Sequence, residues 1–183
     1  MSDAQDALSS PSASSDEEAL GLVRSAFRFA RAGDAGPLAR ALDRGVPPDV
    51  CNENGDSLLM LASYHGHLAA TRLLLERGAD PELRNLRGQS PLAGAAFKGD
   101  AGIAALLLEH GAAADGAGPD GRTPLMFAAM FDRVAVLEML LARGASVDRR
   151  DAAGATAGAL AQAMGAQRTC ARLAAQQSLA RAT

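Results

Sequence analysis

The sequence predicts an all-α repeat protein, and this prediction rests on two series of glycines and on the composition. Each series repeats every 33 residues without interruption; the first is Gly45, Gly78, Gly111 and Gly144, and the second is Gly55, Gly88, Gly121 and Gly154. A regular period of this length is typical of proteins in which similar structural units are stacked. Only 3% of the 183 residues are aromatic, whereas 48% are hydrophobic and alanine is abundant. This composition favours closely packed helices over a sandwich or barrel, whose strands need aromatic and β-branched residues.

Each complete unit is expected to form two helices. Three hydroxyl residues precede apolar stretches and are the predicted N-caps: Ser57, Ser90 and Thr123. Pro91 and Pro124 follow at the first helical position, where proline is well tolerated. In the first complete unit we expect helices over about residues 57–65 and 68–77. A glycine directly after the second helix, such as Gly78, can adopt the left-handed conformation that ends it.

The period divides the chain into five units between two short tails. Three complete units cover about residues 52–84, 85–117 and 118–150, and degenerate units cover about 19–51 and 151–177. The degenerate units keep the helix pair but lose the Thr-Pro-Leu signature, as expected of terminal units that expose one face to solvent. The array as a whole is assigned to residues 16–177. Residues 1–15, which are acidic and rich in Ser and Ala, are predicted to be a disordered tail, and residues 178–183 a C-terminal tail.

The segments between the glycines share one pattern, as in GDSLLMLASYHGHLAATRLLLERGAD and GRTPLMFAAMFDRVAVLEMLLARGAS. They resemble the ankyrin repeat, whose pattern is G-x-TPLH-x-AA-x-x-GH followed by a leucine run and GAD. The resemblance covers about residues 20–175 and agrees in both period and motif. It implies an ankyrin solenoid of about five helix-turn-helix units, including degenerate terminal caps, joined by β-turn or hairpin loops. It also implies that partners meet a concave face made of the hairpin tips and the ends of the inner helices.

Charge and hydropathy argue against several classes of function. Five acidic residues and no Lys or Arg lie within residues 1–18, so this segment accounts for the net charge of −3. The remainder has no clustered basic face of the kind that binds nucleic acid, and no apolar run of about 18 residues that would span a membrane. The N-terminus lacks a secretory signal, and Cys51 and Cys170 form no disulfide framework. A cytoplasmic location is therefore expected.

Three patterns that can carry catalysis or metal binding are interpreted as structural. Gly116, Gly118 and Gly121 match G-x-G-x-x-G, but they follow a predicted helix end rather than the strand that a dinucleotide site requires. The serines of Gly-Asp-Ser and Gly-Gln-Ser lack the closing glycine of a nucleophile elbow. The three histidines form no convergent ligand set. We therefore expect no catalytic residue, no metal and no cofactor.

Candidate partner-binding residues follow from the positions that the resemblance assigns to the concave face. A first row recurs every 33 residues at the ends of the inner helices and comprises Arg31, Tyr64, Phe97 and Met130. The next position in each unit gives a second row, which comprises Ala32, His65, Lys98 and Phe131. The hairpin tips add Glu53, Asp56, Arg87, Gln89 and Arg122. Aromatic, Met and Arg side chains are enriched at interface hot spots, which favours the first row.

The fourth unit departs from the family pattern. Asp132 and Arg133 stand where the pattern has Gly-His, so the turn between its two helices must form without glycine. This substitution leaves the direction of the neighbouring Phe131 open.

The main hypothesis is a non-enzymatic scaffold, monomeric on its own, that binds another protein through its concave face. An alternative is an accessory or inhibitory regulator of an enzyme, similar to bacterial ankyrin proteins that support catalase or deliver a cofactor. For that role only Tyr64, His65 and Cys51 offer candidate ligands for haem or metal. A third hypothesis is a structural array that self-associates through its terminal faces.

Overall fold

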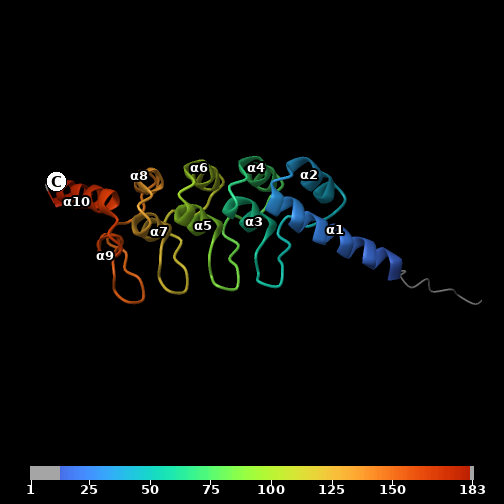
Figure 1. Ribbon diagram of the computed structural model, residues 1–183, viewed down its shortest axis with the longest axis horizontal. Coiled ribbons are helices and arrows are strands. Elements are labelled where there is room, and N and C mark those ends of the chain that lie inside the picture. The colour runs from blue at the N-terminus through green and yellow to red at the C-terminus, as the bar shows by residue number, and fades with distance from the viewer. Residues whose placement is uncertain (1–12, 182–183) are drawn as a thin grey trace, which may run out of the picture.

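The computed structural model describes residues 13–181, which form ten helices stacked as five pairs in a single row (Figure 1). The pairs are α1 (Ala13–Ala32) and α2 (Ala35–Asp43), α3 (Leu58–Tyr64) and α4 (Leu68–Glu76), α5 (Pro91–Lys98) and α6 (Ala101–Glu109), α7 (Pro124–Met130) and α8 (Val134–Ala142), and α9 (Ala157–Ala163) and α10 (Gln167–Arg181). The predicted all-α repeat architecture is therefore confirmed.

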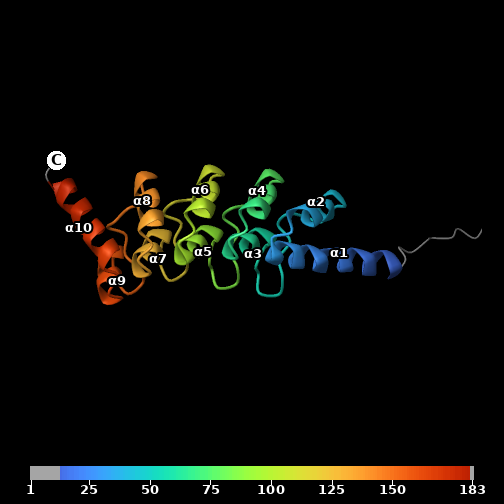
Figure 2. The ribbon, with the colours of Figure 1, turned by 45° about the horizontal axis from the view of Figure 1, so that its top comes forward.

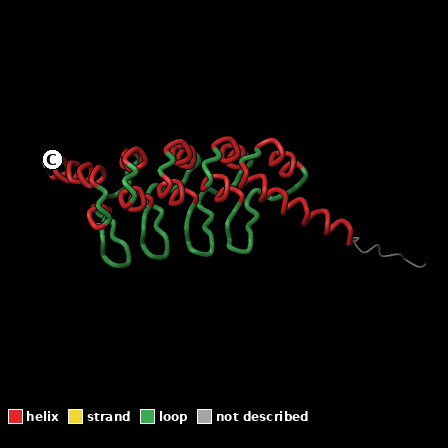
Figure 3. Tube along the Cα trace, in the orientation of Figure 1, coloured by secondary structure: helices red, strands yellow, loops and turns green. Residues whose placement is uncertain are grey.

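The helices form two layers, and the hairpin loops lie beside them. Helices α3, α5, α7 and α9 contact one another along the row and form the inner layer, whereas α4, α6 and α8 form the outer layer (Figures 1 and 2). The loops between consecutive pairs all extend to the same side (Figure 3). Helices α1 and α10 project from the two ends of the row (Figure 2). Between residues 13 and 181, β-structure is limited to an isolated antiparallel bridge between Cys51 and Ser57.

The helix boundaries follow the predicted capping chemistry. The hydroxyl oxygens of Ser57, Ser90 and Thr123 accept hydrogen bonds of 3.1, 3.3 and 3.3 Å from the backbone N–H three residues on. Proline is the first helical residue of α5 and α7, as predicted. Gly78 follows α4 with a φ of 83°, in the left-handed conformation that ends the helix. These local signals confirm the predicted helix pair of each complete unit.

The core is continuous along the row because equivalent positions of every unit are buried. Leucines of the second helix in four successive pairs lie 33 residues apart and are at most 2% exposed: Leu74, Leu107, Leu140 and Leu173. Alanines of the inner layer share the same spacing and are fully buried: Ala62, Ala95, Ala128 and Ala161. Small side chains at these positions allow the inner helices to pack closely. No unit encloses a core of its own, so each depends on its neighbours for stability.

The two tails are shorter than predicted. Helix α1 begins at Ala13, so residues 13–15 are helical, while residues 1–12 of the predicted tail lie outside the described part of the chain. Helix α10 continues to Arg181, so most of the predicted C-terminal tail extends the last helix, and residues 182–183 are not described. At both ends of the row, the outermost helix continues past the point where the equivalent helices of its neighbours stop.

Backbone hydrogen bonds tie neighbouring hairpins together at two of the three seams between them. The amide of Leu86 donates to the carbonyl of Asn54 at 3.0 Å, and the amide of Ala152 donates to that of Asp120 at 2.8 Å. The equivalent position at the seam between them is Pro119, which has no N–H to donate. Pro119 packs closely against Gly88 instead, in space that a side chain there would fill. The seam between the third and fourth units therefore lacks this backbone tie.

Asp132 takes the place of glycine and anchors the last helix. Its φ is 56°, within the left-handed region that glycine occupies at the equivalent positions of other units, such as Gly99 with a φ of 83°. Its carboxylate accepts hydrogen bonds from Arg168 Nε at 2.7 Å and from the Thr169 backbone N–H at 2.9 Å. The hydrogen bond from Arg168 is the main reason that the pKa of Asp132 lies below its ordinary value. The substitution thus replaces glycine's backbone freedom with a side-chain link to α10.

Candidate partner-binding groove

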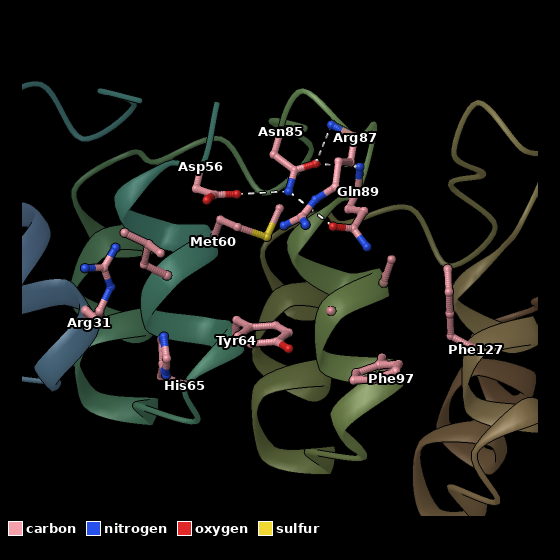
Figure 4. Close-up of a pocket in the computed structure, with 13 residues that line it drawn as sticks. Arg31, Asp56, Met60, Tyr64, His65, Asn85, Arg87, Gln89, Phe97 and Phe127 are labelled. Atoms are coloured by element: carbon pink, nitrogen blue, oxygen red, sulfur yellow. Dashed lines mark hydrogen bonds between the residues drawn. The ribbon is translucent and has the colours of Figure 1, made fainter. Parts of the chain in front are cut away.

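A groove of about 340 Å³ runs along the ends of the inner helices, beside the hairpin loops (Figure 4). Four consecutive units contribute to it, from α1 to α7. Its lining residues are Arg31, Asp56, Met60, Leu61, Tyr64, His65, Asn85, Arg87, Gln89, Ala93, Gly94, Phe97 and Phe127. The groove thus lies on the face where the sequence predicts partner binding.

The structure brings seven predicted residues together in the groove: Arg31, Asp56, Tyr64, His65, Arg87, Gln89 and Phe97. The other five lie around it or away from it: Glu53, Lys98, Arg122, Met130 and Phe131. Glu53 is exposed at a hairpin tip. Met130 is half-buried outside the groove, and Phe127, about one helical turn earlier on α7, takes its place. The 33-residue spacing therefore identifies the row as far as Phe97 but not the residue that ends it.

An absent side chain keeps the middle of the groove open. Leu61, Gly94 and Phe127 occupy equivalent positions of three successive units, and all three line the groove. A Cβ atom at Gly94 would lie 3.6 Å from Cδ2 of Tyr64, which is ordinary van der Waals contact. A larger side chain there would extend into the space between Tyr64 and Phe127. In Figure 4, Tyr64, Phe97 and Phe127 follow one another along this part of the groove.

Aromatic contacts orient the groove's side chains. Tyr64 is 40% exposed, and Nζ of Lys98 lies 5.0 Å from the centre of its ring, within the range of a cation–π contact. Lys98 therefore covers Tyr64 from beside the groove. Phe131 packs edge-to-face on Phe97, with ring centres 4.5 Å apart and an interplanar angle of 70°. This contact determines the direction of Phe131, which the sequence leaves open, and it supports Phe97 from behind.

The hairpin side of the groove is built around Asn85, which sequence reasoning missed. Asn85 is only 6% exposed. Its side-chain amide donates to Oδ1 of Asp56 at 2.9 Å and to Oε1 of Gln89 at 3.3 Å. Its side-chain oxygen, Oδ1, accepts hydrogen bonds from the backbone N–H groups of Arg87 and Gln89 at 3.1 and 3.0 Å (Figure 4). Asn85 thereby links two hairpins and fixes the backbone from which Arg87 and Gln89 project.

The end of α1 is held by a contact between units. Nε2 of His67 lies 2.9 Å from the backbone oxygen of Arg31, at the N-terminal edge of the groove. Arg133 makes the equivalent contact two units later, where its Nε donates to the carbonyl of Phe97 at 3.2 Å. Both residues precede the second helix of their unit, the position of the family's Gly-His histidine. They position groove residues of the neighbouring unit and leave the groove itself clear.

The charges of the groove are mainly positive. Arg31 and Arg87 form no ion pair within residues 13–181. Arg122 lies in an adjoining cavity of about 160 Å³, and its Nε is 3.6 and 3.8 Å from carboxylate oxygens of Asp120 and Asp151. Partial burial lowers the pKa of His65, and the positive charges of His67, Arg31 and Lys98 lower it further. The lowered pKa favours the neutral form of His65, so the positive charge of the groove lining comes mainly from Arg31 and Arg87.

The residues that match catalytic or metal-binding patterns in the sequence have other surroundings in the described part of the chain. No cluster of three or more His, Cys, Asp or Glu residues is arranged to hold a metal ion between residues 13 and 181. Gly116, Gly118 and Gly121 lie in a hairpin loop, and Ser57 and Ser90 are occupied as helix caps. Burial, reinforced by Asp49 and Asp56, raises the pKa of the Cys51 thiol, and Cys51 does not line the groove. None of the described helices is long and apolar enough to cross a lipid bilayer.

Stacked helix pairs with hairpins on one side define a helical repeat protein of the solenoid class. The chain belongs to the ankyrin repeat family. The family model, described as ankyrin repeats (3 copies), matches residues 27–115 and 59–151. An ankyrin repeat protein of Pseudomonas aeruginosa is 52% identical over 64 residues, which are 35% of this chain and 37% of that relative. The match thus spans little more than a third of the relative's length. Ankyrin repeats are generally non-enzymatic protein–protein interaction modules.

Proposed function

We propose that the protein binds a partner protein through the groove and acts without chemistry of its own. The observation that carries this proposal is the row formed by Arg31, Tyr64, Phe97 and Phe127, which comes from four successive units. The fully buried core lies in alanine and leucine side chains behind this row, and of its members Phe127 also packs against that core. Tyr64 is exposed and Phe97 and Phe127 are half-buried, so the row presents accessible aromatic surface of the kind that is typical of interaction sites.

The dimensions of the row suit a protein partner. Helices that pack about 8–10 Å apart give a four-unit row a length of roughly 25–30 Å. A typical stable interface buries about 800 Å² on each partner. We expect the row, the hairpin side of the groove and the adjoining cavity near Arg122 together to provide a contact surface of about that area.

Recognition is proposed to be largely preformed. The hairpin backbone is fixed by Asn85, and Phe97 is supported by Phe131. Both contacts exist in the free chain, so the hairpin backbone and the ring of Phe97 lose little conformational entropy on binding. The free thiols of Cys51, which is exposed, and Cys170 agree with a reducing, cytoplasmic setting, and we infer a monomer in the absence of the partner.

The test compares two substitutions of exposed apolar side chains. Tyr64→Ala removes a groove residue that is 40% exposed, and Leu68→Ala removes a residue on α4 that is 44% exposed and outside the groove. Tagged wild-type and variant chains are used to capture partners from the native cell, with quantification by mass spectrometry. We expect partners recovered by the wild type and by Leu68→Ala to be lost with Tyr64→Ala. Equal recovery by all three chains, with folding unchanged, would rule out the groove as the binding face.

A further inference from the structure

We infer that the groove binds an acidic segment of the partner, with one apolar side chain of that segment seated over Gly94 and flanking carboxylates meeting Arg31 and Arg87. This inference rests on the proposed function and specifies the chemistry of the partner. It follows from the shape of the groove and from the distribution of charge around it.

The shape calls for a single large apolar side chain. The space over Gly94 is bounded by Leu61, Tyr64 and Phe127. The groove's volume of about 340 Å³ lies at the lower end of the range of about 300–1,000 Å³ seen for pockets that enclose small ligands. Such a volume accommodates one or two side chains of an extended segment, and it is too small to enclose a helix. Aromatic walls favour an aliphatic or aromatic side chain at the centre.

The charge calls for acidic residues on either side of that side chain. Arg31 and Arg87 both line the groove and pair with no carboxylate between residues 13 and 181. Lys98 adds a third positive charge at the edge of Tyr64. Asp56 is the acidic residue of the lining, and one of its oxygens already accepts a hydrogen bond from Asn85. Two unpaired guanidinium groups facing one engaged carboxylate are complementary to an anionic ligand, since arginine binds carboxylates in two-pronged geometry.

A protein segment fits these observations better than nucleic acid does. Nucleic-acid binding relies on many cations that follow a phosphate backbone. Here the lining of the groove holds two arginines and one aspartate, which is too few cations to follow a phosphate backbone. A short acidic segment with one apolar residue matches the small number of cations and the aromatic lining.

The experiment measures binding of defined peptides to the full chain. Fluorescein-labelled 12-residue peptides carry a central Leu or Phe flanked by Asp and Glu, by Lys and Arg, or by Ser, and binding is followed by fluorescence anisotropy. Gly94→Leu fills the space over Gly94, and Gly94→Ala fills it partly; both substitutions favour the helical state, so α5 remains folded. Arg31→Glu combined with Arg87→Glu reverses the groove's charge, and Arg72→Glu, on the exposed surface of α4, is the matched control.

We expect the acidic set to bind most tightly, and its affinity to fall as salt is raised. Gly94→Leu should weaken binding by about tenfold or more, with Gly94→Ala in between. The double charge reversal should weaken it by roughly tenfold, whereas Arg72→Glu should leave it within about twofold. Equal binding of the three peptide sets, insensitivity to the double reversal, or tighter binding of a 12-nucleotide oligouridine RNA would each overturn the inference.

The outcomes also separate this inference from the proposed function. If Tyr64→Ala abolishes partner capture but the peptides show no acidic preference, the groove is a binding face for a partner of different chemistry, and the present inference is wrong. If Tyr64→Ala captures every partner of the wild type, both the proposed function and this inference are wrong.

Discussion

Thr71 gives the sharpest test of how the core is held together. Its side chain is fully buried in α4, and among the described residues its hydroxyl has no hydrogen-bond partner. Equivalent positions of three other units hold Leu38, Ala104 and Leu137, all of which are apolar and fully buried. The array therefore buries a polar atom at a position where its other units bury none.

Replacing Thr71 with valine should stabilise the protein. Valine has almost the same shape as threonine and a similar helix propensity, so the change replaces a buried hydroxyl with a methyl group and little else. A buried polar group without a partner costs about 1–3 kcal/mol. We expect Thr71→Val to raise the free energy of unfolding by about 1–2 kcal/mol, which corresponds to an increase in Tm of roughly 2–8 °C for a chain of this size.

Thr169 provides a matched control with the opposite expected sign. It is also fully buried, but its hydroxyl donates to the carbonyl of Ala129 at 2.8 Å, a contact between α10 and α7. Thr169→Val should lower the free energy of unfolding by about 0.5–1.5 kcal/mol, because it removes this hydrogen bond between α10 and α7. Both variants can be compared with the wild type by urea unfolding followed by circular dichroism. If Thr71→Val proves no more stable than the wild type, or if both variants shift in the same direction, the argument from hydrogen-bond satisfaction is wrong.

Three further predictions concern stability. Leu107→Ala should lower the free energy of unfolding by about 2.7–5 kcal/mol, since Leu107 is fully buried, and calorimetry that finds a change below about 1 kcal/mol would contradict the shared core. Gly78→Ala should lower the free energy of unfolding by about 1–2 kcal/mol, because the φ of Gly78 is 83°. Gly55→Ala should lower it more, because its Cβ would also lie 2.8 Å from the amide nitrogen of Leu86. Equal urea midpoints for the two variants would refute this prediction. The lowered pKa of Asp132 means that its stabilising contribution is complete above the unfolded value of 3.8 and is lost as the pH falls through the lowered value. Unfolding midpoints of the wild type and Asp132→Asn should therefore differ at neutral pH and converge below pH 3.8, and a constant difference would exclude the ionised carboxylate as the cause.

Much of the fold could be predicted because its determinants are local and repeated. Caps such as Ser57 and helix ends such as Gly78 act through neighbouring backbone groups, so their effect is readable from a few residues. The start of α1 was harder to predict, because Ser, Asp and Glu near Ala13 resemble a solvated tail. Only the second half of that helix holds fully buried residues, Ala26 and Ala30, and provides an apolar signal.

The groove was predictable in outline but not in its details. Spacing alone placed Arg31, Tyr64 and Phe97 in one row, because equivalent residues of a solenoid align. Asn85 was missed because its role depends on Asp56, which lies 29 residues earlier and becomes a neighbour only after the hairpins stack. The opening at Gly94 was missed because the 33-residue period marks equivalent positions without showing which of them face the groove. The importance of an absent side chain emerges only once Tyr64 and Phe127 are seen on either side of it.

The missing backbone tie at Pro119 has a mechanical consequence. Among the hairpins, the seam between the third and fourth units lacks a backbone hydrogen bond that the flanking seams have. At this seam the two hairpins are therefore held by the packing of Pro119 against Gly88, while the helices keep their contacts through Arg133 and Phe131. This seam crosses the groove between Gly94 and Phe127, so the hairpin that carries Arg87 and Gln89 can shift relative to the next hairpin without breaking a backbone hydrogen bond between them.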